Sequence, residues 1–359
     1  MQLNPKRDSW ALAIHLIKCA AKAKFRLVRS PQPKGVGLVI SRILPPQYFL
    51  KFQLKRIQKM TKSILVAALI SALLGCKTKE PAPTPIPTVS SLVDAQSPKD
   101  AAPFFVGDSL IQTQKNWQLT FSDEFNDTQI NPSKWTIENS IKYRTDVTLY
   151  ANTNQVEAKN GKAYIYYQKS PLHDSAYFAG RMNSRNKFSP TYGYLECRIH
   201  LVKPDGYQTA FWMMPNSDGP MNNAGVKDGT ANDGAEIDIV EGNRLITYSN
   251  GLHWDGYAAP NHKSNGTNIK APDLFTQEYH IFGFEWTPTF LKFYYDGKLV
   301  RTMNTPNLIP HVPHYIYFSG SCFGANDWLN GDVRKNQFIQ KGGRDEAYID
   351  YMRVYKSLK

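Results

Sequence analysis

The sequence has few cysteines, and none of them are spaced as metal ligands usually are. The 359-residue chain contains four, Cys19, Cys76, Cys197 and Cys322. Cys197 and Cys322 lie in segments rich in β-branched and aromatic residues. We expect them to be two buried thiols, with a disulfide as the alternative. Their separation along the chain excludes the short paired spacing of a zinc site.

The chain after residue 76 has no net charge, although the whole chain carries +13. Residues 1–59 hold 13 lysines and arginines and one acid, Asp8, for a net charge of +12. Lys62 adds one more positive charge, which leaves residues 77–359 neutral. A basic chain suggests nucleic acid or an anionic surface. Because the charge is confined to the N-terminal segment, we expect no nucleic-acid partner.

The chain also lacks an apolar run of the ~20 residues that a stable membrane span needs. The short apolar run 64–74 follows Met60 and Lys62, and its last residue, Leu74, is followed by Gly75 and Cys76. This order is typical of a secretory signal, and its end resembles the bacterial lipobox, whose cysteine is lipidated. We therefore expect residues 60–76 to be a lipoprotein signal peptide and residues 1–59 to be a doubtful upstream leader. A short buried helix over 62–75 is the alternative.

Residues 77–103 are expected to form a proline-rich tether. Four prolines fall between Pro81 and Pro87, and such a stretch forms neither helix nor sheet. A tether behind a lipidated cysteine predicts an exported bacterial lipoprotein at the cell surface or in the periplasm. We expect a monomer that meets the membrane through its lipid anchor only.

No long helical period and no internal repeat is present. From residue 104 onward, short runs rich in β-branched and aromatic residues alternate with Gly, Pro, Asn and Asp turns, and Asp296-Gly297 is a hairpin signal. The pattern predicts one all-β domain over 104–359, a curved antiparallel β-sandwich (jelly roll) with a concave substrate cleft. The expected strands are 117–121, 163–168, 193–201, 209–214, 235–241, 251–254, 280–286, 290–295, 315–320 and 347–355.

The segment 234–242 carries three acids, Glu236, Asp238 and Glu241. Alternation along a strand puts Glu236 and Asp238 on one face but would send Glu241 into the core. A buried, unpaired glutamate is costly, so we expect a β-bulge near Ile239 and Val240 that returns Glu241 to the acidic face.

With that bulge, Glu236 and Glu241 lie about four strand steps apart, or roughly 13 Å at 3.3 Å per step. Their carboxyls could then approach to about 5–6 Å, which is close to the spacing of a retaining glycosidase. Crowded negative charges would also raise one pKa and keep an acid protonated. A solvated polar face and a calcium site are the alternatives.

Several segments resemble glycoside hydrolase family 16, in the order in which that family has them. The motif Glu-Ile-Asp-Ile-Val-Glu at 236–241 resembles the family's bulged E-x-D-x-x-E signature. The remaining matches are LTFSDEF at 119–125 followed by Lys134-Trp135, AGR at 179–181, YGYLECR at 192–198, AFWMMP at 210–215, His253-Trp254 and IDYMRVY at 349–355.

The resemblance implies roles for individual residues. Glu236 would be the nucleophile, Asp238 the assisting acid and Glu241 the general acid/base. Trp212 would be an aromatic platform in the cleft, with a core tryptophan as the alternative. His253 would lie near the −1 sugar, with a buried histidine as the alternative.

Four further residues are expected to bind substrate. Trp135 and Trp254 belong to the matching segments, and Arg144 and Arg185 fall where cleft loops should begin. An arginine fork suits a sulfate ester, although solvated surface charge is the alternative for each.

The substrate is expected to be an algal galactan, porphyran or agar. Residues 141–150 lack the pattern common in laminarinases, whereas 253–263 look more like agarases and porphyranases. A β-1,3(4)-glucanase of laminarinase type, a transglycosylase and a non-catalytic surface glycan-binding lipoprotein are the alternatives. No cofactor is expected, with a structural calcium ion as the alternative.

Overall fold

The computed structural model describes residues 92–216, 227–325 and 331–359. The predicted leader 1–59, the signal peptide 60–76 and the first part of the tether lie outside the described residues. The described part of the chain belongs to one compact unit. No helix in it is long and apolar enough to cross a membrane.

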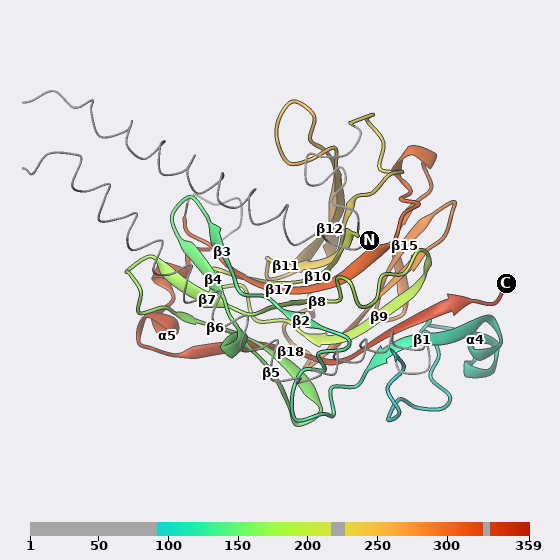
Figure 1. Ribbon diagram of the computed structural model, residues 1–359, viewed down its shortest axis with the longest axis horizontal. Coiled ribbons are helices and arrows are strands. Elements are labelled where there is room, and N and C mark those ends of the chain that lie inside the picture. The colour runs from blue at the N-terminus through green and yellow to red at the C-terminus, as the bar shows by residue number, and fades with distance from the viewer. Residues whose placement is uncertain (1–91, 217–226, 326–330) are drawn as a thin grey trace, which may run out of the picture. The chain divides into compact units, whose positions relative to one another are not determined.

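Two sheets face each other in the described domain (Figure 1). The larger has eleven strands in the order β16-β15-β14-β9-β18-β6-β7-β4-β3, with β1 paired to β18 and β5 to β6. Its strands are β1 (Trp117–Asp123), β3 (Ser140–Tyr143), β4 (Thr148–Ala151), β5 (Val156–Lys159), β6 (Lys162–Lys169), β7 (Ala176–Ala179), β9 (Gly193–His200), β14 (His280–Trp286), β15 (Leu291–Tyr295), β16 (Lys298–Met303) and β18 (Arg344–Ser357).

The smaller sheet has seven strands in the order β13-β12-β11-β10-β17-β8-β2. These are β2 (Thr136–Ile137), β8 (Arg181–Asn183), β10 (Tyr207–Pro215), β11 (Glu236–Gly242), β12 (Thr247–Trp254), β13 (Lys263–Lys270) and β17 (His314–Cys322). Short helices complete the described domain, namely α4 (Leu110–Asn116), α5 (Gln337–Gln340), η1 (Thr153–Gln155), η3 (Pro306–Leu308) and η4 (Val333–Lys335).

The core lies between the two sheets and follows from alternation along their strands. Leu195 of β9 is fully buried, and so are Phe211 of β10, Ile237 of β11 and Phe318 of β17. Burying each such side chain contributes about 2–3 kcal/mol. The predicted all-β sandwich is confirmed, and each of the ten expected strands overlaps an observed one.

Two smaller predictions are also confirmed. Asp296 and Gly297 join β15 to β16 with φ of 46° and 73°, the left-handed pair that a two-residue hairpin turn requires. Cys197 and Cys322 are buried free thiols.

The segment just before the expected domain boundary packs on the domain. Leu92 belongs to the main hydrophobic core, the Asp94 N–H donates to Ser122 Oγ at 2.8 Å, and the Ser97 hydroxyl donates to the same Ser122 Oγ at 2.7 Å. The described end of the predicted tether, residues 92–103, is therefore part of the folded unit.

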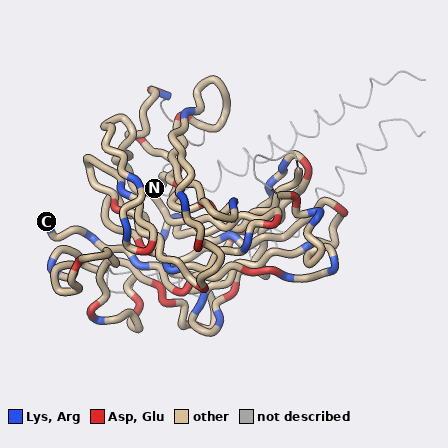
Figure 2. The backbone as a smooth tube through the Cα atoms, turned by 180° about the vertical axis from the view of Figure 1, so that it is seen from behind, with Lys and Arg blue, Asp and Glu red and all other residues tan. Residues whose placement is uncertain are grey.

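Charged residues are distributed along the described chain, with acidic and basic residues interspersed (Figure 2). This arrangement matches the zero net charge of residues 77–359.

Candidate active site

Strand β11 carries a bulge at the predicted place. Asp238 pairs with Trp212 of β10, whereas Val240 pairs with the adjacent Phe211, so Ile239 is the additional residue. On the other side, the register with β12 shifts between Asp238 and Glu241. Ile237 and Val240 are fully buried, while Glu236 and Glu241 are partly exposed. The three acids therefore share the face of β11 that lines a cleft.

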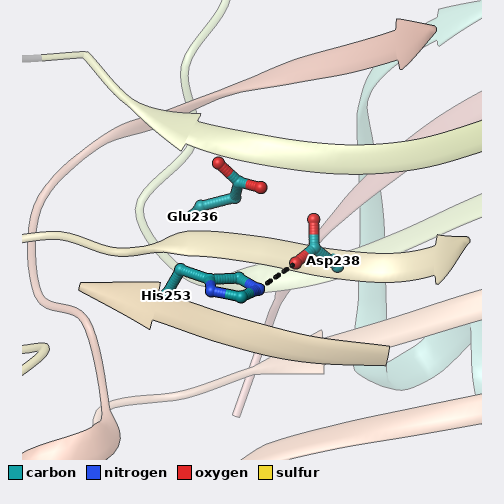
Figure 3. Close-up of side chains that lie close together, drawn as sticks. All are labelled: Glu236, Asp238 and His253. Carbon is teal, nitrogen blue, oxygen red and sulfur yellow. Dashed lines mark ion pairs between the residues drawn. The ribbon is translucent and has the colours of Figure 1, made fainter. Parts of the chain in front are cut away.

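The first two acids lie beside a histidine of the neighbouring strand (Figure 3). His253 pairs with Glu236 across β11 and β12, and its Nε2 lies 3.6 Å from Asp238 Oδ2. Ligand atoms of Glu236, Asp238 and His253 all lie within 4.8 Å of one another. Asp238 is only 3% exposed, so its charge is poorly solvated.

This close packing perturbs the proton equilibria of all three acids. Burial, followed by the charge of Glu241, raises the pKa of Glu236 to about 8. Burial raises the pKa of Glu241 to about 7. Burial and then the two glutamates raise the pKa of Asp238 well above its ordinary value. Interacting carboxyls of this kind share protons as a group.

Hydrogen bonds and cations oppose these upward shifts. A hydrogen bond with Asp238, then Arg181, then Lys142 lower the pKa of Glu236. Gln208 Nε2 donates to Glu241 Oε1 at 2.8 Å, and this bond, followed by Arg144, lowers the pKa of Glu241. Each glutamate thus faces its own donors and cations, so the two ends of the acid row are electrostatically distinct.

The cleft has a volume of about 610 Å³. It is lined by acids, cations, aromatic rings and small polar side chains, namely Lys142, Tyr143, Arg144, Arg181, Gln208, Ala210, Trp212, Glu236, Asp238, Glu241, His253, Tyr257, His262, Ser319 and Ser321.

One wall of the cleft is a fixed aromatic assembly. Trp212 stacks on Tyr317 with ring centroids 4.2 Å apart, and its indole N–H donates to Ser319 Oγ at 3.0 Å. Arg181 Nε donates to Glu138 Oε2 at 3.0 Å, and the Tyr317 hydroxyl donates to the same carboxylate. The half-buried Trp212 ring is therefore held in one orientation beside the acids.

The cationic and aromatic residues predicted to bind substrate divide into two groups. Trp212, His253 and Arg144 line the cleft. Arg185 does not line it, and its guanidinium lies over the Tyr315 ring, 5.7 Å from the centroid.

Two tryptophans were wrongly predicted to contact substrate. Trp135 is 2% exposed and Trp254 is 7% exposed, and both belong to the main core. The indole N–H of Trp135 donates to Asp123 Oδ2 at 2.8 Å. Trp254 follows His253 on β12, and because successive side chains point to opposite faces, a cleft-facing His253 sends Trp254 inward.

The prediction missed several lining residues. Gln208 could have been found, because it lies two and four positions before the cleft-facing Ala210 and Trp212 on one strand. Tyr143, Tyr257 and His262 lie outside the predicted strands, where no periodicity marks the direction of a side chain.

Calcium fits the acid row poorly. Glu236, Asp238 and His253 offer one nitrogen and few oxygens, whereas calcium takes six to eight oxygen ligands. A second group, Asp273, His280 and Asp296, is similar in composition. Its His280 Nδ1 already contacts Asp296 Oδ2 at 2.7 Å.

A β-sandwich whose cleft holds a row of coupled carboxyls beside a fixed aromatic ring has the features of a carbohydrate-active hydrolase. Residues 116–357 match the family model described as "Beta-porphyranase A-D, GH16 domain". The chain belongs to glycoside hydrolase family 16.

Two sequence relatives and one solved structure are similar to this chain. A glucan endo-1,3-beta-glucosidase A1 from Niallia circulans is 27% identical over 76% of this chain, which spans only 41% of that relative. A keratan-sulfate endo-1,4-beta-galactosidase from Sphingobacterium multivorum is 26% identical over 83% of this chain and 68% of its own length. The laminarinase catalytic domain of Thermotoga maritima MSB8 superposes with a TM-score of 0.55 at 26% identity, covering 68% of this chain and all of that domain.

Proposed function

We propose that this protein is an endo-acting, retaining β-glycosidase. The bulged strand β11 carries the proposal, because it brings Glu236, Asp238 and Glu241 to one face of an open cleft. An open cleft admits a polymer along its length, which suits cleavage inside a chain.

In the first step, the Glu236 carboxylate attacks the anomeric carbon, and the Glu241 carboxylic acid gives its proton to the departing glycosidic oxygen. A glycosyl ester on Glu236 results. In the second step, the Glu241 carboxylate takes a proton from water, and the water oxygen displaces Glu236 by attacking the opposite face of the sugar, the face that the departing oxygen left. Two displacements retain the anomeric configuration. The raised pKa of Glu241, about 7, supplies the protonated acid that the first step needs.

Asp238 assists Glu236. The hydrogen bond between them lowers the pKa of Glu236 and raises that of Asp238, so Asp238 is the partner that carries the proton. A protonated Asp238 stabilises the charged nucleophile and releases it as the ester forms.

We further propose a red-algal galactan, porphyran or agar, as the substrate. The matching family model is that of porphyranases. Lys142, Arg144 and Arg181 line the cleft of a domain without net charge, and such cations suit a sulfate ester. The relative from Sphingobacterium multivorum is named for a sulfated polysaccharide and for galactosidase activity.

A β-1,3(4)-glucan is the competing substrate. Its support is the glucanase from Niallia circulans and the Thermotoga laminarinase domain. A transglycosylase would use the same residues, and a glycan-binding lipoprotein would use the same cleft without turnover.

A substrate panel tests both levels of the proposal. We expect reducing ends from porphyran or agarose, and fewer from carrageenan, laminarin and lichenan. Cleavage of the two glucans alone would refute the galactan, and binding without depolymerisation of any substrate would refute the enzyme. Product NMR distinguishes retention from inversion, and an added acceptor sugar reveals transglycosylation.

Matched variants test the residue roles. Glu236→Gln and Glu241→Gln should each lower kcat by about 10³-fold or more while glycan binding persists. Glu157→Gln removes a surface carboxylate whose partner is Tyr166, far along the larger sheet, and should leave kcat unchanged. An active Glu236→Gln variant would overturn the nucleophile assignment.

The proposed location is an exported lipoprotein held by Cys76. Mass spectrometry of the mature N-terminus tests it, with a lipidated Cys76 as the first residue expected. A mature chain that begins before Met60 would contradict the lipobox interpretation.

A further inference from the structure

The loop between β12 and β13 turns back over the nucleophile. Asp255 and Gly256 have φ of 61° and 82°, left-handed values that reverse the chain directly after β12. Tyr257 follows them, lines the cleft and is 52% exposed. An aromatic side chain this exposed gains little from burial, so its position calls for another reason.

Tyr257 contacts one catalytic group directly. Its hydroxyl donates a hydrogen bond to Glu236 Oε2. Glu236 also has a hydrogen bond with Asp238, so its carboxyl lies between one partner from its own strand and one from the loop. Two donors fix the rotation of a carboxylate in a way that one cannot.

The loop is anchored at both of its ends. At the first end, Asp255 is buried, and its Oδ2 accepts the Gly229 N–H at 2.9 Å. At the other, His262 Nε2 lies 3.0 Å from His253 Nδ1, and the two rings stack with centroids 5.2 Å apart. Because His253 Nε2 in turn faces Asp238, the loop is joined to the acid row through both Tyr257 and His262.

We propose that Tyr257 is a positioning residue that orients the Glu236 carboxylate and stabilises its charged form. This proposal rests on the proposed function, because Glu236 must act as the nucleophile for its orientation to matter in catalysis. Tyr257 acts through Glu236, and no step of the reaction transfers its proton.

The electrostatics of the cleft explain why such a donor is needed. Burial raises the pKa values of both glutamates, whereas the reaction needs Glu236 charged while Glu241 is protonated. A hydrogen bond to a charged group favours the charged form. The other ionisable groups that face Glu236 are Asp238 and Glu241 on β11, His253 on β12, Lys142 on β3 and Arg181 on β8.

Tyr257→Phe tests the proposal in the full-length protein, because it removes the hydroxyl and keeps the ring. We expect the acidic limb of the pH profile of kcat/KM to move up by about one pH unit, the shift that one hydrogen bond to a charged group produces. At the wild-type optimum, kcat should fall about tenfold while KM changes less than about threefold.

A second measurement does not depend on turnover. In protein labelled with ¹³C at the glutamate carboxyls, the Glu236 resonance, assigned through Glu236→Gln, should titrate at higher pH in Tyr257→Phe than in wild type. Tyr166→Phe is the matched control, because it removes a tyrosine–glutamate hydrogen bond of 2.7 Å outside the cleft, and it should shift neither readout.

The outcomes separate the two proposals. An unchanged Glu236 titration in Tyr257→Phe, or a fall in kcat equal to that of Tyr166→Phe, overturns the role of Tyr257. A wild-type protein that releases no reducing ends from any polysaccharide overturns the proposed function, while the titration still decides whether Tyr257 stabilises the charge of Glu236.

Discussion

Replacing Gln208 with leucine should move the basic limb of the pH–activity profile to higher pH. Gln208 Nε2 donates to Glu241 Oε1 at 2.8 Å, and this bond favours the charged form of Glu241. Burial raises the pKa of Glu241 to about 7 against the opposing effects of Gln208 and Arg144. Removing the donor therefore raises the pKa further, and Glu241 stays protonated to higher pH.

The size of the shift follows from the strength of one bond. A hydrogen bond to a charged group contributes about 1.5–3 kcal/mol, and one pKa unit corresponds to about 1.4 kcal/mol. Solvent reaches the partly exposed Glu241 and offsets part of the loss, so the lower end applies. The basic limb should move up by about one pH unit.

The assay is the pH dependence of kcat/KM, measured as reducing ends released from whichever polysaccharide the wild type cleaves. Gln114→Leu is the control, because Gln114 Nε2 makes a bond of the same 2.8 Å length to Asp100 O at the surface. A basic limb that stays in place, or moves to lower pH, would refute the assignment of Glu241 as the acid.

Four further predictions concern stability, substrate binding and thiol reactivity. The folded-state pKa of Glu236 is raised from 4.5 to about 8, so its protonated form is the stabilising one and the stability of the wild type falls as pH rises through that window. Calorimetry should therefore show that Glu236→Gln has a Tm roughly 5 °C above that of wild type at pH 8.5 and little above it at pH 4. An equal gain at both pH values would contradict this. Trp212→Ala should raise KM about tenfold with a smaller effect on kcat. In affinity electrophoresis, Arg144→Met should weaken binding of a sulfated galactan more than binding of its desulfated form. Equal losses of binding on both forms would argue against sulfate recognition. Burial raises the pKa values of Cys197 and Cys322, so peptide mapping after maleimide treatment should find both modified only in denaturant, and labelling of the native protein would show that the sheets open.

The sequence was most informative where the physical alternatives were few. A charged Glu241 could not sit in the core, so the bulge followed from alternation together with the cost of burying a charge, and the register of β11 confirms it. The error at Trp254 came from not applying the same alternation one residue beyond His253.

Short and edge strands were harder to predict. Strands β2 and β8 have two and three residues, too few to show a period. Strand β13 is exposed almost throughout and ends the smaller sheet. Its sequence KSNGTNIK therefore lacks alternation, as polar edge strands often do.

Contacts between distant segments left no local signal. Tyr257 reaches Glu236 through a loop whose course depends on two left-handed residues. Leu92 enters the core from a segment whose prolines and polar residues predicted a tether.

The single additional residue of β11 has a consequence for how this chain tolerates change in length. Removing Ile239 would leave the order Glu236, Ile237, Asp238, Val240, Glu241, which alternates strictly between cleft and core. All three acids would keep their face, and the same four strand steps would still separate the two glutamates. A one-codon deletion here would thus cost a buried isoleucine and preserve the order of the acids. The separation of the two glutamates along the strand therefore does not depend on this one residue.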